Sequence, residues 1–506
     1  MAWNLTLAVY LIAIVGMAIF GVNSGWMLVR SQWARLAARR AKSAPPAPPQ
    51  PESEWPFVTV QLPIFNERYV AERIVRAAAA LDWPRDRLQI QVLDDSTDDT
   101  ADLTTSVVRE LRDAGIDIEH RHRNDRRGYK AGALAAAMPH VKGEFIALFD
   151  ADFVPGTDWL RRILIEQQAF ADPRTGFAQT RWTYLNREHS LVTRAQAMMH
   201  DVHFLVEQEV RCRSGLWFNF NGSGGLWRRT CIDDAGGWQI DTLTEDLDLS
   251  YRAALRGWRG EYRSGIHAPN ELPERILAFK KQQARWARGS IQTARKMLGP
   301  VLRSDAGLFT KFCATVHLCG YSMHALLISF LILWPLLCAG VTNAPTNSIP
   351  LWANLLSPTS LGFILGFPIV QLSRGRDWRK IFPELLLTVV IGVGVSAANS
   401  VAVMRGLFGK DPGEFVRTPK SGDVSRGSRY RIQLDATVVF ELAMMIWLAT
   451  WAVVLWHNNA PLWSLACAFY SACFAHFILG QAWEIRLDRP RAQPAVAEDA
   501  CSAANS

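Results

Sequence analysis

The alternation of long apolar runs with ordinary polar sequence constrains this chain more than any other feature. The apolar runs occupy residues 4–29, 317–341, 351–372, 381–404, 433–456 and 460–480. A mean hydropathy near zero is therefore the average of two populations. Runs of this length are typical of membrane-spanning helices. The polar sequence at 55–300 is of the size of one globular domain of about 250 residues.

Positive charge follows the first apolar run, where Arg30, Arg35, Arg39, Arg40 and Lys42 are concentrated. Basic residues favour the cytoplasmic side, so we expect an external N-terminus and a cytoplasmic polar domain. The start of the run has no basic residue and no A-x-A-like cleavage site follows, which disfavours a signal peptide. The net charge of +8 fits membrane-flanking loops. Without a zinc-finger or basic-aromatic RNA-binding motif, we expect no nucleic-acid partner.

The eight cysteines include no C-x-x-C pair, and about half of them fall in apolar runs. We therefore expect buried thiols in a reducing compartment, with no metal or disulfide role.

The run at 381–404 decides the topology. If it crossed the membrane, the basic loop 405–432 would lie outside, against the usual charge distribution. We therefore expect an interfacial helix there, five spans in total and a cytoplasmic C-terminus. The predicted parts are an N-terminal transmembrane helix (1–30), a basic and Pro-rich linker (31–54), a cytoplasmic domain (55–300), a transmembrane pair with the interfacial helix and a loop (301–432), a second transmembrane pair (433–482) and a C-terminal tail (483–506), which is expected to be disordered from Arg491.

The polar domain alternates strand-like and helix-like segments. Strands are expected at 57–62, 90–93 and 145–149, and a helix capped by Asn66 is expected at 67–83. This order predicts an α/β fold with a mostly parallel sheet, whose ligands bind at the carboxyl ends of the strands. Acidic clusters follow two of the predicted strands.

The first cluster, Asp150-Ala151-Asp152, presents two carboxylates that can hold a divalent cation beside a diphosphate. The second, Asp94-Asp95, can accept hydrogen bonds from a nucleoside. Each cluster also fits a plain alternative, a solvated turn for the first and an Asx turn for the second.

Three further motifs carry possible chemistry. Lys130 lies beside small residues at an expected helix start, which suits phosphate, although a charged loop fits equally. Glu245 and Asp246 suit a general base, or acids that favour a helix N-terminus. The segment 220–229 combines a Gly-rich turn with aromatic residues, which suits sugar rings or simple packing.

The order of these motifs is more informative than any one of them. The segments VQLPIFNE, VLDDSTD, GYKAGAL, FDADF, QTRW, FNGSGGLWR, TEDLDLSYRA and ELPE…FKKQQARW follow one another over about 58–290. This set resembles the family 2 glycosyltransferases of GT-A fold. Within them it resembles the membrane-embedded processive group of cellulose, chitin and hyaluronan synthases, and most of all the cellulose-synthase-like A proteins, which make plant β-mannan and glucomannan.

The resemblance implies a role for each matched residue. Catalysis would fall to Asp246, with Glu245 as the next candidate base, and Mg2+ or Mn2+ would be held by Asp150 and Asp152. The donor nucleotide sugar would contact Pro63, Glu67, Asp94, Asp95, Lys130, Asp150 and Arg285. The acceptor would contact Phe220, Asn221, Gly222, Gln282 and Trp286. The segment 414–422 resembles a gating loop, with Phe415, Arg417, Thr418 and Lys420, although Arg417 and Pro419 depart from the FxVTxK pattern.

The implied enzyme is an inverting hexosyltransferase that polymerises sugar from GDP-mannose or UDP-glucose into a β-linked polysaccharide and extrudes it through its own channel. Its partners would be the nucleotide sugar, the growing glycan and the bilayer. The Ala- and Arg-rich composition points to a bacterial inner membrane. The alternatives are single addition to a lipid acceptor, as in ceramide glucosyltransferases, a non-catalytic scaffold or exporter subunit, and a stand-alone binding module.

Overall fold

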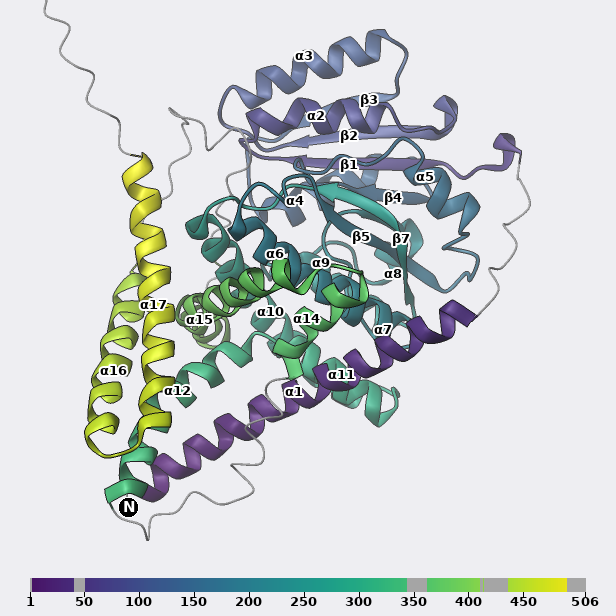
Figure 1. Ribbon diagram of the computed structural model, residues 1–506. Coiled ribbons are helices and arrows are strands. Elements are labelled where there is room, and N and C mark those ends of the chain that lie inside the picture. Colours follow the sequence, from purple (N-terminus) through teal and green to yellow (C-terminus); the bar gives the residue numbers. More distant parts are fainter. Residues whose placement is uncertain (1, 41–50, 344–361, 410–412, 414–435, 489–506) are drawn as a thin grey trace, which may run out of the picture.

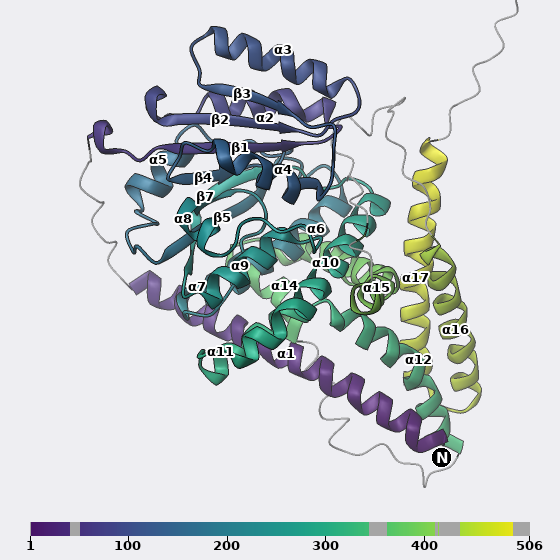
Figure 2. The ribbon, with the colours of Figure 1, turned by 180° about the vertical axis from the view of Figure 1, so that it is seen from behind.

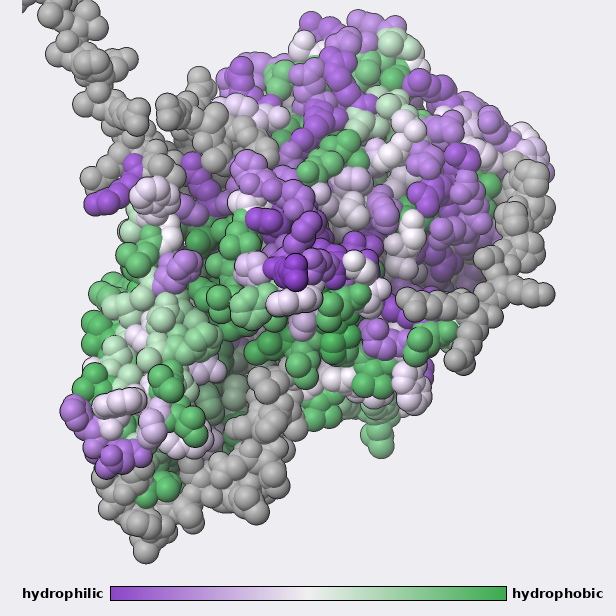
Figure 3. All heavy atoms as spheres, viewed as in Figure 1, coloured by the Kyte–Doolittle hydropathy of each residue, from purple (hydrophilic) through white to green (hydrophobic). Residues whose placement is uncertain are grey.

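The computed structural model describes residues 2–40, 51–343, 362–409, 413 and 436–488. It has two parts, an α/β domain and a set of long helices below it (Figure 1). Hydrophilic residues cover most of the α/β domain in this view, whereas hydrophobic residues gather over the long helices (Figure 3). This division matches the alternation of apolar and polar sequence.

A seven-stranded sheet forms the centre of the α/β domain, in the order β3-β2-β1-β4-β6-β5-β7. β6 runs antiparallel to both of its neighbours and the other pairs are parallel, so the expected mostly parallel sheet is confirmed. The strands are β1 (Val58–Ile64), β2 (Leu88–Asp94), β3 (Ile118–His122), β4 (Phe145–Leu148), β5 (Thr175–Tyr184), β6 (Gly225–Arg228) and β7 (Arg259–Asn270).

The described helices cover the sheet and form the lower part of the molecule. Those of the α/β domain are α2 (Arg68–Ala79), α3 (Thr100–Asp113), α4 (Tyr129–Ala137), α5 (Trp159–Arg161), α6 (Leu191–Val202), α7 (Glu209–Arg213), α8 (Arg229–Asp234) and α9 (Glu245–Leu255). The others are α1 (Ala2–Arg40), α10 (Ile276–Arg303), α11 (Leu308–Leu318), α12 (Ser322–Asn343), α14 (Gly362–Ser373), α15 (Trp378–Phe408), α16 (Thr437–His457) and α17 (Pro461–Asp488).

Alternating side chains of the central strands build one hydrophobic core on each face of the sheet. Val60 and Leu62 of β1 pack with apolar residues of α2, α3 and α5. Ile146 and Leu148 of β4 pack on the other face with residues of α4, α8 and α9. Because both faces are covered, ligands can reach the sheet only at the ends of its strands.

Two local predictions differ from the structure. Asn66 does not cap α2, because Glu67 occupies the cap position. Asn66 instead adopts a φ of +52° and its side-chain oxygen accepts a hydrogen bond from the Thr97 N–H at 2.8 Å. The basic stretch after residue 30 was expected to be linker, but α1 continues through it to Arg40. The apolar residues and the basic residues that follow them therefore belong to one continuous helix.

Five helices of the described residues are long and apolar enough to cross a membrane, namely α1, α12, α15, α16 and α17. α16 and α17 lie side by side, and α15 crosses their direction in both views (Figures 1 and 2). The interfacial position expected for 381–404 stays a prediction. Of the expected span 351–372, only α14 lies within the described residues, and it is short.

Most of the described cysteines are buried, as the sequence predicted. The seven that the structure describes are free, and five of them are buried.

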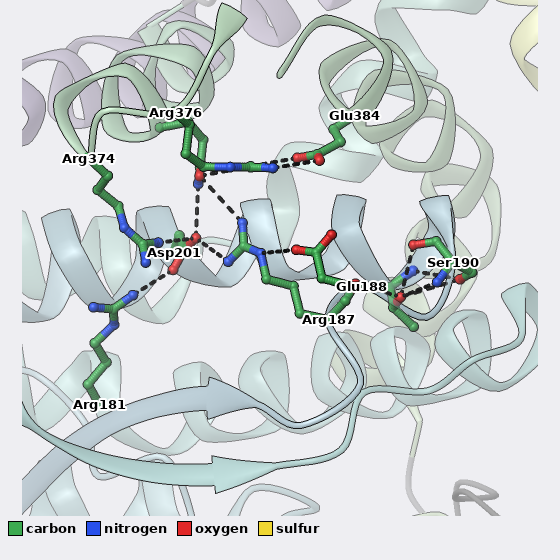
Figure 4. Close-up of polar contacts among 10 residues, drawn as sticks. Arg181, Arg187, Glu188, Ser190, Asp201, Arg374, Arg376 and Glu384 are labelled. Carbon is green, nitrogen blue, oxygen red and sulfur yellow. Dashed lines mark hydrogen bonds and ion pairs between the residues drawn. The ribbon is translucent and has the colours of Figure 1, made fainter. Parts of the chain in front are cut away.

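A buried carboxylate joins the α/β domain to the α14–α15 connection (Figure 4). Asp201 of α6 accepts hydrogen bonds from Arg181 and Arg187 at 2.9 Å and from Arg374 at 2.7 Å. Close by, Arg376 donates two bonds of 2.7 Å to Glu384 of α15. Burial opposes the ionisation of Asp201, but the charges of Arg187 and Arg374 outweigh it and lower its pKa.

We expect Asp201→Asn to destabilise the protein strongly, because three guanidinium groups lose their common carboxylate. Removing one partner of a buried pair costs about 3–5 kcal/mol. Glu188→Gln is the control, since Glu188 is 71% exposed and lies 3.6 Å from Arg187. An exposed pair of that kind contributes about 1 kcal/mol or less. Thermal unfolding in detergent measures both variants, and equal unfolding midpoints would contradict the structural role of Asp201.

Candidate active site

Most residues that the sequence singled out line one cavity at the carboxyl ends of the central strands. The predicted residues around it are Pro63, Glu67, Asp95, Lys130, Asp150, Asp152, Asn221, Gly222, Glu245, Asp246, Gln282, Arg285 and Trp286. They come from segments more than 200 residues apart in the sequence. The chain order of the motifs therefore corresponds to one site in space.

Local structure explains how each segment reaches the cavity. Asp95 follows β2, and the pair Asp150 and Asp152 follows β4. Both strands belong to the part of the sheet in which neighbouring strands run parallel. Lys130 lies in the first turn of α4, which begins after Gly128 with a φ of +74°. Such a φ favours glycine and lets the chain turn sharply into the helix. Glu245 begins α9, so its carboxylate lies at a helix N-terminus.

Lys130 is the cation around which the acidic residues gather. Its ammonium group donates to Asp150 Oδ1 and, at 2.8 Å, to the carbonyl oxygen of Gly222. Glu245 Oε1 lies 4.0 Å away. Burial alone would lower the pKa of Lys130, but Asp150 and Glu245 outweigh it and the pKa is raised. Lys130 is therefore held in its charged form.

Asp246 is the acid whose protonation is most strongly altered. Burial, and then the charge of Glu245, raise the pKa of Asp246 to about 7. Its Oδ1 accepts the Leu247 N–H at 2.8 Å. Gly222 lies against its other oxygen, because a Cβ on Gly222 would stand 3.0 Å from Asp246 Oδ2. A carboxylate with this pKa can accept a proton near neutral pH, as a general base must.

Arg285 and Trp286 enter the cavity from α10. Burial lowers the pKa of Arg285, although Glu245 and Asp150 act in the opposite direction. A guanidinium remains charged in proteins, so it provides a fixed positive charge for an anion. The Trp286 ring lies 6.2 Å from that of His200, which in turn lies 6.4 Å from Trp182. These rings give the cavity an aromatic wall of the kind that sugar rings stack on.

Another part of the cavity is built from the residues that follow β1 and β2 and from the loop before α4. Arg123 holds Asp95 through two hydrogen bonds, of 2.7 and 2.6 Å. The Arg126 guanidinium lies over the Phe65 ring, 3.3 Å from its centroid. A planar base has both a carboxylate acceptor and a stacked cation available here.

Two predicted residues do not line the cavity. Asp94 is fully buried, and its carboxylate accepts from the Ser96 N–H at 2.8 Å and is 2.9 Å from His120 Nε2. Burial opposes its ionisation, but those hydrogen bonds lower the pKa of Asp94. Phe220 packs in the core beside Phe177 and Trp227. Neither Asp94 nor Phe220 is among the residues that line the cavity, so their contacts with the donor and the acceptor stay predictions.

The predicted gating residues Phe415, Arg417, Thr418 and Lys420 lie outside the described residues.

Sequence reasoning missed several cavity residues. Phe65, Tyr129, Trp182 and Glu271 lie within motifs that the sequence had marked, but they were given no role of their own. Arg126 and His200 lie outside the marked segments, and the fold brings them to the cavity. His120, His122 and Asp94 also lie close enough together to hold a metal ion. None of these three lines the cavity, so they do not replace Asp150 and Asp152.

Asp150 and Asp152 fit a divalent cation. Both line the cavity. The ammonium group of Lys130 contacts one oxygen of Asp150, so the carboxylate already attracts a cation. Carboxylate oxygens are the ligands that Mg2+ and Mn2+ prefer.

Comparison with known proteins identifies the family of this chain. Residues 56–289 match the sequence profile of the family described as glycosyltransferase like family 2. Glucomannan 4-beta-mannosyltransferase 9 of Arabidopsis thaliana is 34% identical over 384 residues, which cover 74% of this chain and 70% of that protein. Glucomannan 4-beta-mannosyltransferase 1 of Oryza sativa subsp. japonica is 35% identical over 417 residues, which cover 79% and 76%. These relatives are plant proteins, so they do not support the expected bacterial source.

A solved structure confirms the fold. Mannosyltransferase PcManGT from Pyrobaculum calidifontis, in complex with GDP-Man and Mn2+, superposes with a TM-score of 0.51 and 22% identity. The superposition covers 80% of this chain and 100% of that chain. The predicted GT-A fold is therefore present, joined to a set of long apolar helices.

We expect Asp246→Asn to lower sugar transfer by about 10²–10⁴-fold, the usual contribution of a general base. Asparagine keeps the size of the side chain and caps a helix as well as aspartate does. A capping role alone would therefore leave turnover close to that of the wild type. Donor binding should persist, because Asp95, Lys130 and Asp150 remain. In the wild type, turnover should fall as the pH drops below about 7, where Asp246 becomes protonated.

Turnover and donor affinity of purified Asp246→Asn and Glu245→Gln, measured side by side, test this assignment. A silent Asp246→Asn with an inactive Glu245→Gln would place the base at Glu245.

Proposed function

This chain belongs to the family 2 glycosyltransferases and is a membrane polysaccharide synthase, and we propose that it polymerises mannose from GDP-mannose into a β-linked polysaccharide. One observation carries the proposal. Cationic Lys130 and Arg285, the pair Asp150 and Asp152, and the proton acceptor Asp246 all face one cavity. The diphosphate of a nucleotide sugar needs the two cationic side chains and the pair of aspartates, and the acceptor hydroxyl needs the proton acceptor.

The names of the relatives guide the choice of donor. Plant proteins at 34% and 35% identity are named glucomannan 4-beta-mannosyltransferases, and PcManGT was solved with GDP-Man. Mannose is the sugar that these names share. We propose that the guanine nucleoside lies between Asp95 and the stacked Arg126 and Phe65, with the diphosphate toward Lys130 and Arg285. UDP-glucose is the competing donor.

We propose that Asp150 and Asp152 hold Mg2+ or Mn2+ when the donor binds. A divalent cation there would neutralise negative charge on the diphosphate leaving group. Lys130, which contacts Asp150 in this structure, would then turn its ammonium group to the phosphate oxygens. The charges of the chain support this exchange, because Asp150 and Glu245 both lie close to Lys130.

The transfer itself is proposed as one in-line displacement at the anomeric carbon. Asp246 accepts the proton of the acceptor hydroxyl while the hydroxyl oxygen bonds to the anomeric carbon. At the same time, the bond between this carbon and the diphosphate oxygen breaks. The nucleoside diphosphate leaves with the bonding electrons, held by Lys130 and Arg285. An α-linked donor thereby gives a β-linked product. Trp286 and Gln282 hold the terminal sugar of the acceptor.

The placement of the site favours a growing chain over a single lipid acceptor. Gln282, Arg285 and Trp286 lie on α10, which packs directly against α15 and α17 among the long apolar helices. A polymer that leaves this site meets the membrane helices at once. We propose that the α/β domain is cytoplasmic and that the chain crosses the membrane between these helices.

We expect purified protein to convert GDP-mannose into a polymer that an endo-β-mannanase digests. Labelled GDP-mannose, GDP-glucose and UDP-glucose should be supplied separately, and each product treated with a mannanase and a β-glucanase. A glucanase-sensitive product from UDP-glucose would overturn the choice of donor and keep the synthase. A product of one sugar on a lipid would overturn polymerisation.

Asp152→Ala should abolish transfer and weaken donor binding, and excess EDTA should do the same to the wild type, because the diphosphate loses its counter-charge. Asp158→Ala is a suitable control, since Asp158 lies outside the cavity at the start of α5. Restoring Mn2+ should rescue the EDTA-treated wild type but not Asp152→Ala. Full activity in EDTA would rule out a metal requirement.

A further inference from the structure

Helix α10 presents two opposite faces to two different parts of the molecule. At about 100° per residue, Gln282, Arg285 and Trp286 lie between about 140° and 240° around the helix from Lys280. The side chains of Gln282, Arg285 and Trp286 line the cavity. Lys280 therefore points away from the site, toward the long apolar helices.

Lys280 enters a fully buried polar network there. Its ammonium nitrogen lies 2.6 Å from Glu441 Oε1 of α16, and both side chains are 0% exposed. The same nitrogen donates to Gln481 Oε1 of α17 at 3.2 Å. The Gln481 amide in turn donates to Glu441 Oε2 at 2.7 Å. One side chain from each of three helices thus meets in a closed, charge-balanced set.

The start of α10 is held by α17. The residues around its first turn provide no side-chain cap. The Glu484 carboxylate of α17 takes that place, accepting from the Ile276 N–H at 2.5 Å and the Leu277 N–H at 3.1 Å. Two N–H groups that every helix leaves open are therefore bonded to a residue about 200 positions away.

Apolar contacts bring the two helices close enough for these bonds. Ile276 packs over Gly480, where a Cβ would stand 2.7 Å from Ile276 Cδ1. Phe279 and Phe477 belong to one buried cluster between α10, α15 and α17. The polar network thus lies within a tightly packed contact.

Stability alone does not explain a buried ion pair at this place. Removing two charges from water costs as much as their attraction returns, and apolar residues of similar volume are often as stable. An ionisable residue within an apolar helix is by default a functional feature. What charged and hydrogen-bonded groups add is a defined direction and register.

We propose that Lys280, Glu441, Gln481 and Glu484 are positioning residues of the transferase. They fix the rotation and height of α10 against α16 and α17, so that Gln282, Arg285 and Trp286 reach the cavity on its far side. The proposal rests on the proposed function of that cavity. On this proposal, α16 and α17 help to set the positions of the side chains that carry out the transfer.

The decisive variant is K280M/E441L/Q481L, which replaces the network by apolar side chains. Glu441→Gln is the companion, since it keeps the shape and leaves the ammonium group without a carboxylate. The control is R376M/E384L, which removes a different ion pair, one between the α14–α15 connection and α15. Three quantities are measured on each purified protein: the unfolding midpoint, the turnover, and amide hydrogen exchange in peptides over 276–290 and 129–137.

We expect Glu441→Gln to lower the midpoint and the triple variant to recover it. Turnover of the triple variant should nevertheless stay about 10²-fold below the wild type, the effect of a misplacement of about 1 Å. Its amides over 276–290 should exchange faster and those over 129–137 should not. The control should keep its turnover. Glu441→Gln should show the same faster exchange, which decides the matter if the triple variant does not fold.

Turnover that returns together with the midpoint would reduce the network to a structural role and overturn the proposal. Unchanged exchange over 276–290 would also overturn it. A wild type that makes no polymer from any nucleotide sugar would instead refute the proposed function, and the exchange measurement would still test the positioning role.

Discussion

The concentration of opposite charges at the carboxyl ends of β1, β2 and β4 is the constraint on which the rest of the structure depends. Asp150, Glu245 and Asp246 line one cavity with Lys130. Carboxylates this close raise one another's pKa unless cations are held among them. The sheet order brings the acids together, and the turns before α4 and α9 aim their first residues at the same point. Burial, and then the charge of Glu245, leave Asp246 with a pKa of about 7, which suits a proton acceptor.

Helix α10 connects the α/β domain to the long apolar helices. One face of this helix completes the cavity through Arg285 and Trp286, and the other carries Lys280 into contact with α16 and α17. A second junction lies at Asp201, where arginines from the α/β domain and from the α14–α15 connection bind the same carboxylate (Figure 4). A site fastened at both places keeps a fixed relation to the long apolar helices, as the proposed passage of a polymer between these helices requires.

Local patterns in the sequence predicted the mostly parallel sheet, because strand ends and helix starts are local features. The fold family and most of the cavity residues were predicted from the resemblance of the ordered motifs to the family 2 glycosyltransferases. What the sequence could not predict depends on long-range contacts. Asn66 has the side chain of a helix cap, yet the Thr97 N–H claims it across the strand ends. Phe220 and Asp94 stand in motifs beside residues that line the cavity, but both are buried in the interior. The partners of Lys280 are 161 and 201 residues away, and no local signal marks them.

The central claim is that one cavity binds a nucleotide sugar beside the base that activates its acceptor. An experimental structure of the full-length protein with GDP-mannose and Mn2+ tests it most directly. The account predicts guanosine beside Asp95, the diphosphate against Lys130 and Arg285, and the mannose anomeric carbon facing Asp246. A nucleotide bound elsewhere, or a sugar turned away from Asp246, would contradict it.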